Sequence, residues 1–207
     1  MSQEPIVVKI GGSLARSADV LERVLAIVAR SPRGVAVVPG GGVFADAVRQ
    51  AQTMFGFDDL VAHQMAILGM HQTGLMFAAL APALDTSENL AEIADKVPSG
   101  EKLVWLPLND CENDAALPAT WDTTSDAIAA RLAERLGRLK VIFLKSRSGG
   151  ELSSVHALAE ERIIDPIAAR IIENAGLDFE VIAADEETRL CEILGVSMQV
   201  DVPPAPC

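Results

Sequence analysis

The sequence predicts an α/β protein: a three-layer αβα sandwich with a mainly parallel central sheet. A short apolar strand, a glycine-rich turn and an amphipathic helix follow one another twice, over residues 6–30 and 35–55. Half of the 207 residues are hydrophobic but only 4% are aromatic, so the core has to be aliphatic. Repetition of this unit is typical of a parallel sheet with helices on its faces.

The first glycine turn follows an apolar run, Ile-Val-Val-Lys-Ile over residues 6–10, and consists of Gly11, Gly12 and Ser13. Glycines let the backbone approach another group closely, and N–H groups that begin a helix attract anions. Lys9, at the end of the strand, would add a positive charge at the same place. The segment therefore predicts a phosphate site. The alternative is an ordinary core strand with a lysine whose head reaches solvent.

The second glycine turn comprises Gly40, Gly41 and Gly42, between a strand over 35–38 and a helix over 43–55. In open α/β sheets, ligands bind beyond the carboxyl ends of the strands. Both turns are therefore expected at one edge, which favours a polyphosphate or two phosphorylated ligands. The alternative is that glycine serves only the tight turn itself.

Two other nucleotide motifs fit poorly. Residues 40–45 match the spacing of a dinucleotide fingerprint, which also requires a strand that ends in an acid about 20 residues later. Asp58 stands near that distance, but residues 50–57 are polar and do not resemble a strand. A dinucleotide oxidoreductase is therefore a weak interpretation. A P-loop sequence, Gly-x-x-x-x-Gly-Lys-Ser/Thr, is absent.

The remaining elements follow from periodicity and from glycine and proline positions. Further helices are expected over 58–84, 87–95, 127–136, 165–174 and 185–194, and further strands over 102–108, 140–145, 179–183 and 197–202. A single domain over 1–202 and a frayed tail over 203–207 are predicted. His63 and His71 are more typical of helix packing than of metal binding, because nothing supplies a third ligand.

A polar loop over 109–123 is long enough to be functional. After it, Thr124-Ser125-Asp126 caps the next helix. Asp126 is either a first-turn acid that favours the helix dipole or an acid that orients lysines or a metal-bound phosphate. The strand over 140–145 then ends in Lys145, so a third strand end carries a cation.

Charge and cysteine content exclude several classes. The net charge is −12, which argues against a nucleic-acid partner because phosphate contacts need a basic face. A basic amphipathic membrane helix is absent, and no charged-then-apolar leader precedes the first strand. Three separated cysteines suit a reducing compartment. We expect a cytoplasmic protein with no nucleic-acid or membrane partner.

Three motifs together resemble the amino-acid kinase superfamily: Lys9-Ile-Gly-Gly-Ser-Leu, Val38-Pro-Gly-Gly-Gly and Thr124-Ser-Asp-Ala-Ile-Ala. That superfamily includes acetylglutamate, aspartate, uridylate and isopentenyl phosphate kinases. The short length and Leu117-Pro-x-x-Trp-Asp-x-Thr-Ser-Asp-x-Ile-Ala look like its methanofuran-biosynthesis branch. The activity of that branch is phosphorylation of [5-(aminomethyl)furan-3-yl]methyl phosphate to the diphosphate.

The resemblance implies an amino-acid kinase (carbamate kinase-like) fold, ATP as phosphoryl donor, and Mg²⁺ held mainly by the phosphates rather than by a protein metal site. It implies catalytic roles for Lys9 at the transferred phosphoryl group, for Lys145, and for Asp126 as the acid that organises the lysines or the nucleotide. The implied phosphate- and substrate-binding residues are Gly11, Gly12, Ser13, Gly40, Gly41 and Gly42. The implied nucleotide-binding residues are Lys145, Ser146, Arg147, Gly149 and Gly150.

Two further expectations concern substrate and assembly. An aminomethyl substrate needs a carboxylate for its ammonium, and Asp58, Asp114 and Asp122 are candidates. Relatives commonly dimerise through the region of the Ala/Leu/Met-rich helix over 60–84, so a homodimer or a higher homo-oligomer is expected. The alternative is an ordinary core helix within one subunit, which would have the same composition.

One segment departs from the family pattern. The loop after Lys145 usually carries an Asp-Val-Asp-Gly-like sequence, whereas residues 146–150 read Ser-Arg-Ser-Gly-Gly, and a usual Gly-Thr pair near Gly195 is missing. This departure motivates an alternative function: a non-catalytic subunit that binds a nucleotide or anion and has a structural or regulatory role.

Overall fold

A computed structural model describes residues 4–112, 114–146 and 154–197 of the chain. Its strands are β1 (Ile6–Ile10), β2 (Val35–Pro39), β3 (Asp85–Ser87), β4 (Lys102–Trp105), β5 (Lys140–Lys145) and β6 (Phe179–Ala183). They form one sheet in the order β3-β4-β2-β1-β5-β6, and every pair is parallel. The helices are a 3-10 helix η1 (Gly12–Arg16), α1 (Ala18–Ala29), α2 (Gly42–Phe55), α3 (Asp59–Leu80), α4 (Leu90–Lys96), α5 (Leu108–Cys111), α6 (Ser125–Arg135), α7 (Val155–Glu160), α8 (Pro166–Ala175) and α9 (Glu187–Leu194).

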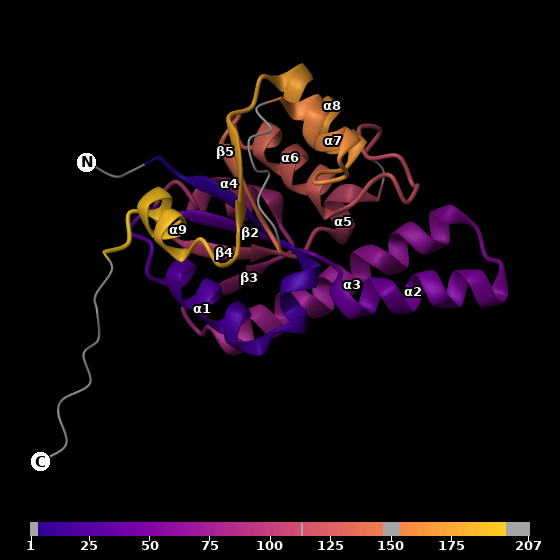
Figure 1. Ribbon diagram of the computed structural model, residues 1–207, viewed down its shortest axis with the longest axis horizontal. Helices are drawn as coiled ribbons and strands as arrows, with labels where there is room; N and C mark the ends of the chain where they lie inside the picture. The colour runs from indigo at the N-terminus through magenta and orange to yellow at the C-terminus, as the bar shows by residue number, and fades with distance from the viewer. Residues whose placement is uncertain (1–3, 113, 147–153, 198–207) are drawn as a thin grey trace, which may run out of the picture.

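The sheet is covered on both faces, as the sequence predicts. Side chains alternate between the faces of a strand, so each strand contributes to two separate cores. Val7 and Phe143 pack with α4, α6, α7 and α8 on one face. Ile6, Val8 and Leu144 pack with α1 and α9 on the other. Figure 1 shows these layers, and the prediction of a three-layer αβα sandwich is confirmed.

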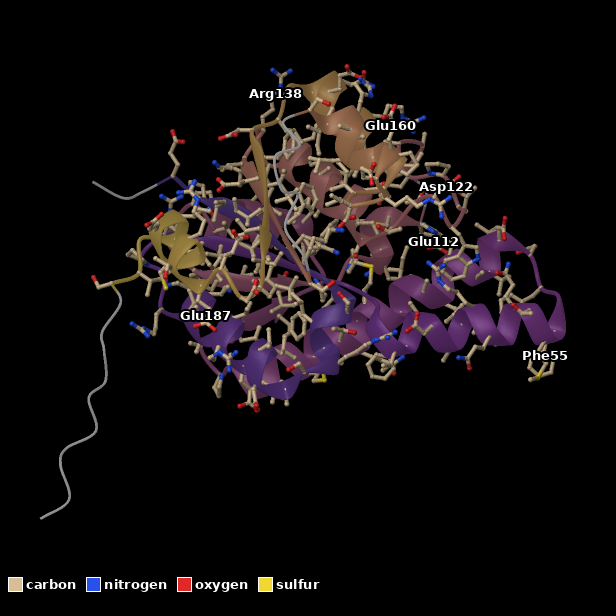
Figure 2. All side chains as sticks on the ribbon, viewed as in Figure 1. Phe55, Glu112, Asp122, Arg138, Glu160 and Glu187 are labelled. Carbon is tan, nitrogen blue, oxygen red and sulfur yellow. The ribbon has the colours of Figure 1, made fainter. Side chains whose placement is uncertain are left out.

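Helices α2 and α3 form a hairpin that extends beyond the sheet (Figure 1). The base of the hairpin packs on the sheet because Gly74 of α3 leaves room for side chains of Val104 and Leu106. Figure 2 shows Phe55 at the free end of the hairpin, far from the sheet. The hairpin therefore projects one wall past the carboxyl end of β2.

Several boundaries differ from the sequence prediction for local reasons. The helix expected over 58–84 ends at Leu80, just before Pro82, which cannot continue a helix. A three-residue edge strand, β3, follows; it is too short to show a periodic pattern. The helix expected over 87–95 begins at Leu90, because the side chain of Asn89 caps its first turn.

The other differences lie in the second half of the chain. The strand expected over 102–108 ends at Trp105, shortly before Pro107, and the short helix α5 occupies the start of the predicted loop. Helix α7 was not predicted. Of the strand expected over 197–202, only Ser197 belongs to the described residues. The tail over 203–207 lies outside them. The single domain over 1–202 thus remains a prediction. In the described ranges, no helix is long and apolar enough to cross a bilayer.

Candidate active site

Two lysines meet at the carboxyl edge of the sheet because of strand register. Lys9 lies two residues after Val7, so its side chain faces the layer that contains α6. Lys145 lies two residues after Phe143 on the neighbouring strand and faces the same layer. The pairing of Ile10 with Leu144 places the two lysines at adjacent strand ends. The register alone therefore brings both cations to one face and one edge.

Asp126 joins these lysines. It lies in the first turn of α6, fully buried among the layers, and each of its carboxylate oxygens meets one ammonium group. Lys9 Nζ is 2.9 Å from Oδ1, and Lys145 Nζ is 2.5 Å from Oδ2. Lys9 is 4% exposed, so this is a buried cluster with one negative and two positive charges. The cluster carries a surplus positive charge toward any ligand.

Burial and neighbouring charges perturb the acid and one of the lysines. Burial alone would raise the pKa of Asp126, but Lys9 and Lys145 together lower it below its ordinary value. The pKa of Lys145 falls from 10.5 to about 8, because burial disfavours its charge and Lys9 repels it, while Asp126 acts in the opposite direction. Asp126 is thus held ionised, and Lys145 loses its proton unusually easily.

Asp165 fixes the position of α6. Its Oδ2 accepts hydrogen bonds from the backbone N–H and hydroxyl of Thr124 and from the N–H of Ala127, at 3.0, 2.6 and 3.0 Å. Its Oδ1 accepts from the N–H of Ala168 in α8, at 2.6 Å. Burial, more than the charge of Asp126, raises its pKa. One carboxylate therefore caps two helices and places the turn that carries Asp126.

The two glycine turns face each other directly. A Cβ atom at Gly12 would lie 2.4 Å from the nitrogen of Gly42, and one at Gly40 would lie 2.3 Å from the nitrogen of Gly12. Gly42 also has a positive φ of 52°. The turns therefore require glycine in order to approach each other, whether or not a ligand is bound.

The predicted phosphate donors divide into two groups. The N–H groups of Gly11 and Gly40 donate to the carbonyls of Leu144 and Ile10, so they extend the strand pairing. Gly12 begins η1, Gly42 begins α2 and Gly41 caps α2. The first N–H groups of a helix have no partner within it. Gly12, Ser13, Gly41 and Gly42 line the cavity described next, whereas Gly11 and Gly40 do not.

A cavity of about 730 Å³ opens over the lysine cluster. Its walls come from η1, the N-terminal half of α2, the first turn of α6, one side of α3, and residues within segments 121–124 and 159–166. The cations that line it are Lys9, Arg16, Arg49, Lys145 and Arg162, and the acids are Asp46, Asp122, Asp126 and Asp165. The whole chain has 17 basic and 29 acidic residues, so the cavity is locally enriched in positive charge. It can attract an anion in spite of the overall charge.

The outer wall contains residues that sequence reasoning missed. Arg49 stacks on the ring of Trp121 at 4.0 Å, and Trp121 Nε1 donates to Gln52 of α2 at 2.7 Å. These contacts tie the 109–123 loop to the hairpin. Arg16 pairs with Asp46 at 2.8 Å. The signals for Trp121 were the length of the loop and its place in the Leu117-Pro-x-x-Trp-Asp motif, but neither indicates its contact with Arg49, because contacts between distant segments leave no local pattern.

The other predicted residues are placed as follows. Ser146 is exposed at the end of β5, and Arg147, Gly149 and Gly150 lie outside the described residues. Of the candidate ammonium-binding acids, Asp58 caps α3, Asp114 pairs with Arg131 at 2.7 Å, and Asp122 lines the cavity. Within the described ranges, no three His, Cys, Asp or Glu side chains are grouped to hold a metal.

A family model described as the amino acid kinase family matches residues 4–149. The chain belongs to the amino acid kinase family. The family prediction is therefore confirmed, and the matched stretch contains both glycine turns and the Lys9–Asp126–Lys145 cluster. Asp165 and α8, which brace the cluster, lie beyond it.

One relative of this amino acid kinase is the [5-(aminomethyl)furan-3-yl]methyl phosphate kinase of Methanocaldococcus jannaschii. It is 29% identical over 147 residues, which cover 69% of this chain and 66% of that protein. The match thus spans just under two thirds of the relative's length.

Two solved structures share the fold of this chain. The uridylate kinase of Archaeoglobus fulgidus superposes with a TM-score of 0.69 at 19% identity, covering 93% of this chain and 97% of that one. The carbamate kinase of Giardia lamblia bound to AMP-PNP superposes with a TM-score of 0.62 at 11% identity, covering 94% and 97%. At these identities the likeness shows the fold alone.

Proposed function

We propose that this protein is an ATP-dependent kinase that transfers a phosphoryl group to a phosphorylated small molecule. The observation that carries the proposal is the buried cluster in which Asp126 holds Lys9 and Lys145 at two adjacent strand ends. Phosphoryl transfer requires positioning of the reactants and positive charge on the transferred oxygens, with little covalent chemistry from the protein. Family membership supports the same class of activity.

Each residue of the cluster has a separate role in this proposal. The ammonium groups of Lys9 and Lys145 offset the charge that develops on the oxygens of the transferred group. Asp126 keeps the two lysines together in spite of their repulsion. The N–H groups of Gly12, Gly41 and Gly42 bind phosphate oxygens at the starts of η1 and α2. Gly11 and Gly40 act in our proposal through the shape of the turns.

The acids at the cluster favour an acceptor that is already an anion. Two lysines lower the pKa of Asp126, which makes it a poor proton acceptor, and Asp165 is already bound by two helix N-termini. An alcohol acceptor would need a general base, whereas a phosphomonoester oxygen attacks without one. In the transfer, that oxygen forms a bond to the γ-phosphorus, and the bond from the γ-phosphorus to the ADP oxygen breaks. The products are a diphosphate and ADP.

The residues present fit the phosphates of ATP. The lysines and helix N-termini supply positive charge, and the carbamate kinase with AMP-PNP has the same fold. We propose that Lys145 and the segment after it, Ser146, Arg147, Gly149 and Gly150, bind the nucleotide. Because both oxygens of Asp126 are engaged, Mg²⁺ would enter with ATP and be held mainly by its phosphates. The ion would there offset charge on the transferred group.

Our specific candidate for the acceptor is [5-(aminomethyl)furan-3-yl]methyl phosphate. The support is the name of the 29% identical relative and the sequence resemblance. Of the acids expected to meet the ammonium group, we favour Asp122. Asp58 and Asp114 have other partners, whereas Asp122 lines the cavity and makes no hydrogen bond or ion pair with any described residue.

We propose that the protein forms a homodimer or a higher homo-oligomer and acts in the cytoplasm. The outer side of α3 exposes Val61, Met65, Leu68 and Leu75, which follow the alternating spacing of a helix–helix seam. Light scattering on Leu68→Glu would show a smaller particle than the wild type. The described cysteines, Cys111 and Cys191, are buried and unpaired, which suits a reducing compartment.

The test is release of ADP by the purified chain with Mg-ATP and a panel of acceptors. The panel contains the aminomethylfuran phosphate, isopentenyl phosphate, UMP and acetylglutamate. Turnover with one acceptor that Lys9→Ala abolishes, but Lys140→Ala retains, supports the proposal. Lys140 is the matched control because it stands at the opposite end of β5 in surface ion pairs. Silence with every acceptor, with the fold intact, would favour the non-catalytic subunit.

A further inference from the structure

Two histidines on α3 differ in one informative respect. His71 Nε2 accepts a hydrogen bond from the backbone N–H of Leu108 at 2.9 Å. His63 is 8% exposed, yet its Nε2 has no hydrogen-bond partner among the described residues. His63 also lines the cavity over the lysine cluster, whereas His71 does not. His71 thus has a structural partner, and His63 lacks one.

A buried polar atom without a partner is unfavourable for folding. Most buried side-chain polar atoms in proteins are hydrogen-bonded, and each exception calls for an explanation. An apolar side chain of similar volume at position 63 would avoid this cost. The nitrogen itself is closed to solvent, so the ring has to turn about its Cβ–Cγ bond to meet a bound molecule, and the cavity that the side chain borders provides the space.

The position of His63 along α3 indicates which part of a ligand it would meet. His63, Ala66, Ile67 and Met70 share one side of the helix and all line the cavity. The carbonyl of Ala66 lies beside Gly41, at the phosphate-binding end. His63 lies about one helical turn, roughly 5 Å, nearer the free end of the hairpin. The wall therefore runs from the glycine turns over an apolar strip to one imidazole.

We infer that His63 binds, through Nε2, a hydrogen-bond-donating arm of the acceptor, a primary amine, while the acceptor's phosphate lies at the glycine turns and its apolar body lies along Ala66, Ile67 and Met70. This inference rests on the proposed function and adds a specificity-determining residue to it. Burial lowers the pKa of His63, so at neutral pH the ring is uncharged. A neutral imidazole can accept one N–H of the ammonium group without repelling it, beside the contact proposed for Asp122, and it offers no positive charge to an anion.

The experiment compares two probes by titration calorimetry on the full chain. One is the aminomethylfuran phosphate; the other carries a methyl group in place of the aminomethyl group. For His63→Leu we expect the Kd of the amine to rise about ten- to a hundredfold and the Kd of the methyl analogue to stay unchanged. We also expect the melting temperature to rise, because the orphaned nitrogen is gone. His71→Leu is the matched control: it should lower the melting temperature and leave both Kd values unchanged.

Other outcomes overturn the inference. A lower melting temperature in His63→Leu with unchanged discrimination would show that the side chain is structural. Equal loss of affinity for both probes would show that the substitution damages the cavity and that His63 does not select an amine. Failure of the wild type to bind either probe would show that the assigned ligand is wrong. Amine-selective binding without phosphoryl transfer would refute only the proposed kinase activity.

Discussion

Lys145 makes stability and activity respond to pH in opposite directions. Its pKa is about 8 in the folded protein and is expected near 10.5 when the chain unfolds. Between these values the folded state has released the proton and the unfolded state still holds it. Stability rises with pH wherever the unfolded state binds more protons. Lys145 therefore contributes stability that increases from about pH 8 to 10.5.

The size of the effect follows from the two pKa values. At about 1.4 kcal/mol per pKa unit, the full window corresponds to about 3 kcal/mol. Between pH 7 and 9.5, roughly 2 kcal/mol should be visible. Lys145 is 17% exposed at its side chain, so solvent screening removes little of it. Activity should move the other way, because a neutral amine no longer offsets phosphate charge: kcat/KM should fall above about pH 8.

Urea unfolding at several pH values, on the wild type and on Lys145→Met, isolates this contribution. Burial raises the pKa of the Cys111 thiol to about 12, so this thiol lowers the stability of both proteins as pH rises above about 9. The difference between wild type and Lys145→Met removes this shared effect. Lys140→Met, at the other end of β5, should show no such difference. Parallel stability curves for wild type and Lys145→Met, or constant kcat/KM up to pH 9.5, would refute the reasoning.

Three further substitutions, with Asp58→Ala as a control, probe the scaffold of the site. Asp126→Asn leaves two buried ammonium groups without a counter-ion and should lower the free energy of unfolding, measured with urea, by about 3–5 kcal/mol. The loss should be smaller at high pH, where Lys145 is neutral. An unchanged urea midpoint would contradict the buried cluster. Gly12→Ala forces a methyl group against the backbone of Gly42 and should cost about 1–3 kcal/mol by thermal unfolding. Asp165→Ala removes the cap of α6 and of α8 and should cost about 2–4 kcal/mol; Asp58→Ala, which loses one exposed cap, should cost about 1 kcal/mol.

The core of the site could be predicted from the sequence because local rules determine it. Strands that alternate with helices form a parallel sheet, and the carboxyl ends of such strands share an edge. Lys9 and Lys145 end two apolar strands, and Asp126 begins a helix, so each residue is recognisable from its neighbours. Their meeting then requires only that β1 and β5 be adjacent, which they are.

The rest of the site depends on contacts between distant segments. Asp165 could be recognised as the cap of α8, but nothing local indicates that it also holds α6, about 40 residues earlier. Trp121 and Arg49 meet only because the hairpin projects past the sheet. His63 looks like any helix residue until its missing hydrogen bond is found in the structure. Sequence periodicity identifies elements, whereas these contacts depend on how the elements pack.

The glycine turns and the lysine cluster differ in how well they separate a kinase from a non-catalytic relative. Gly12, Gly40 and Gly42 are required by the close approach of the two turns, so an inactive subunit with this fold would need them as well. Nothing in the packing requires Lys9 and Lys145 to share one buried carboxylate. A buried charge cluster is weak support for stability, and apolar residues of similar volume are often as stable or more so. The presence of the lysines therefore points to ligand chemistry more directly than the presence of the glycines does.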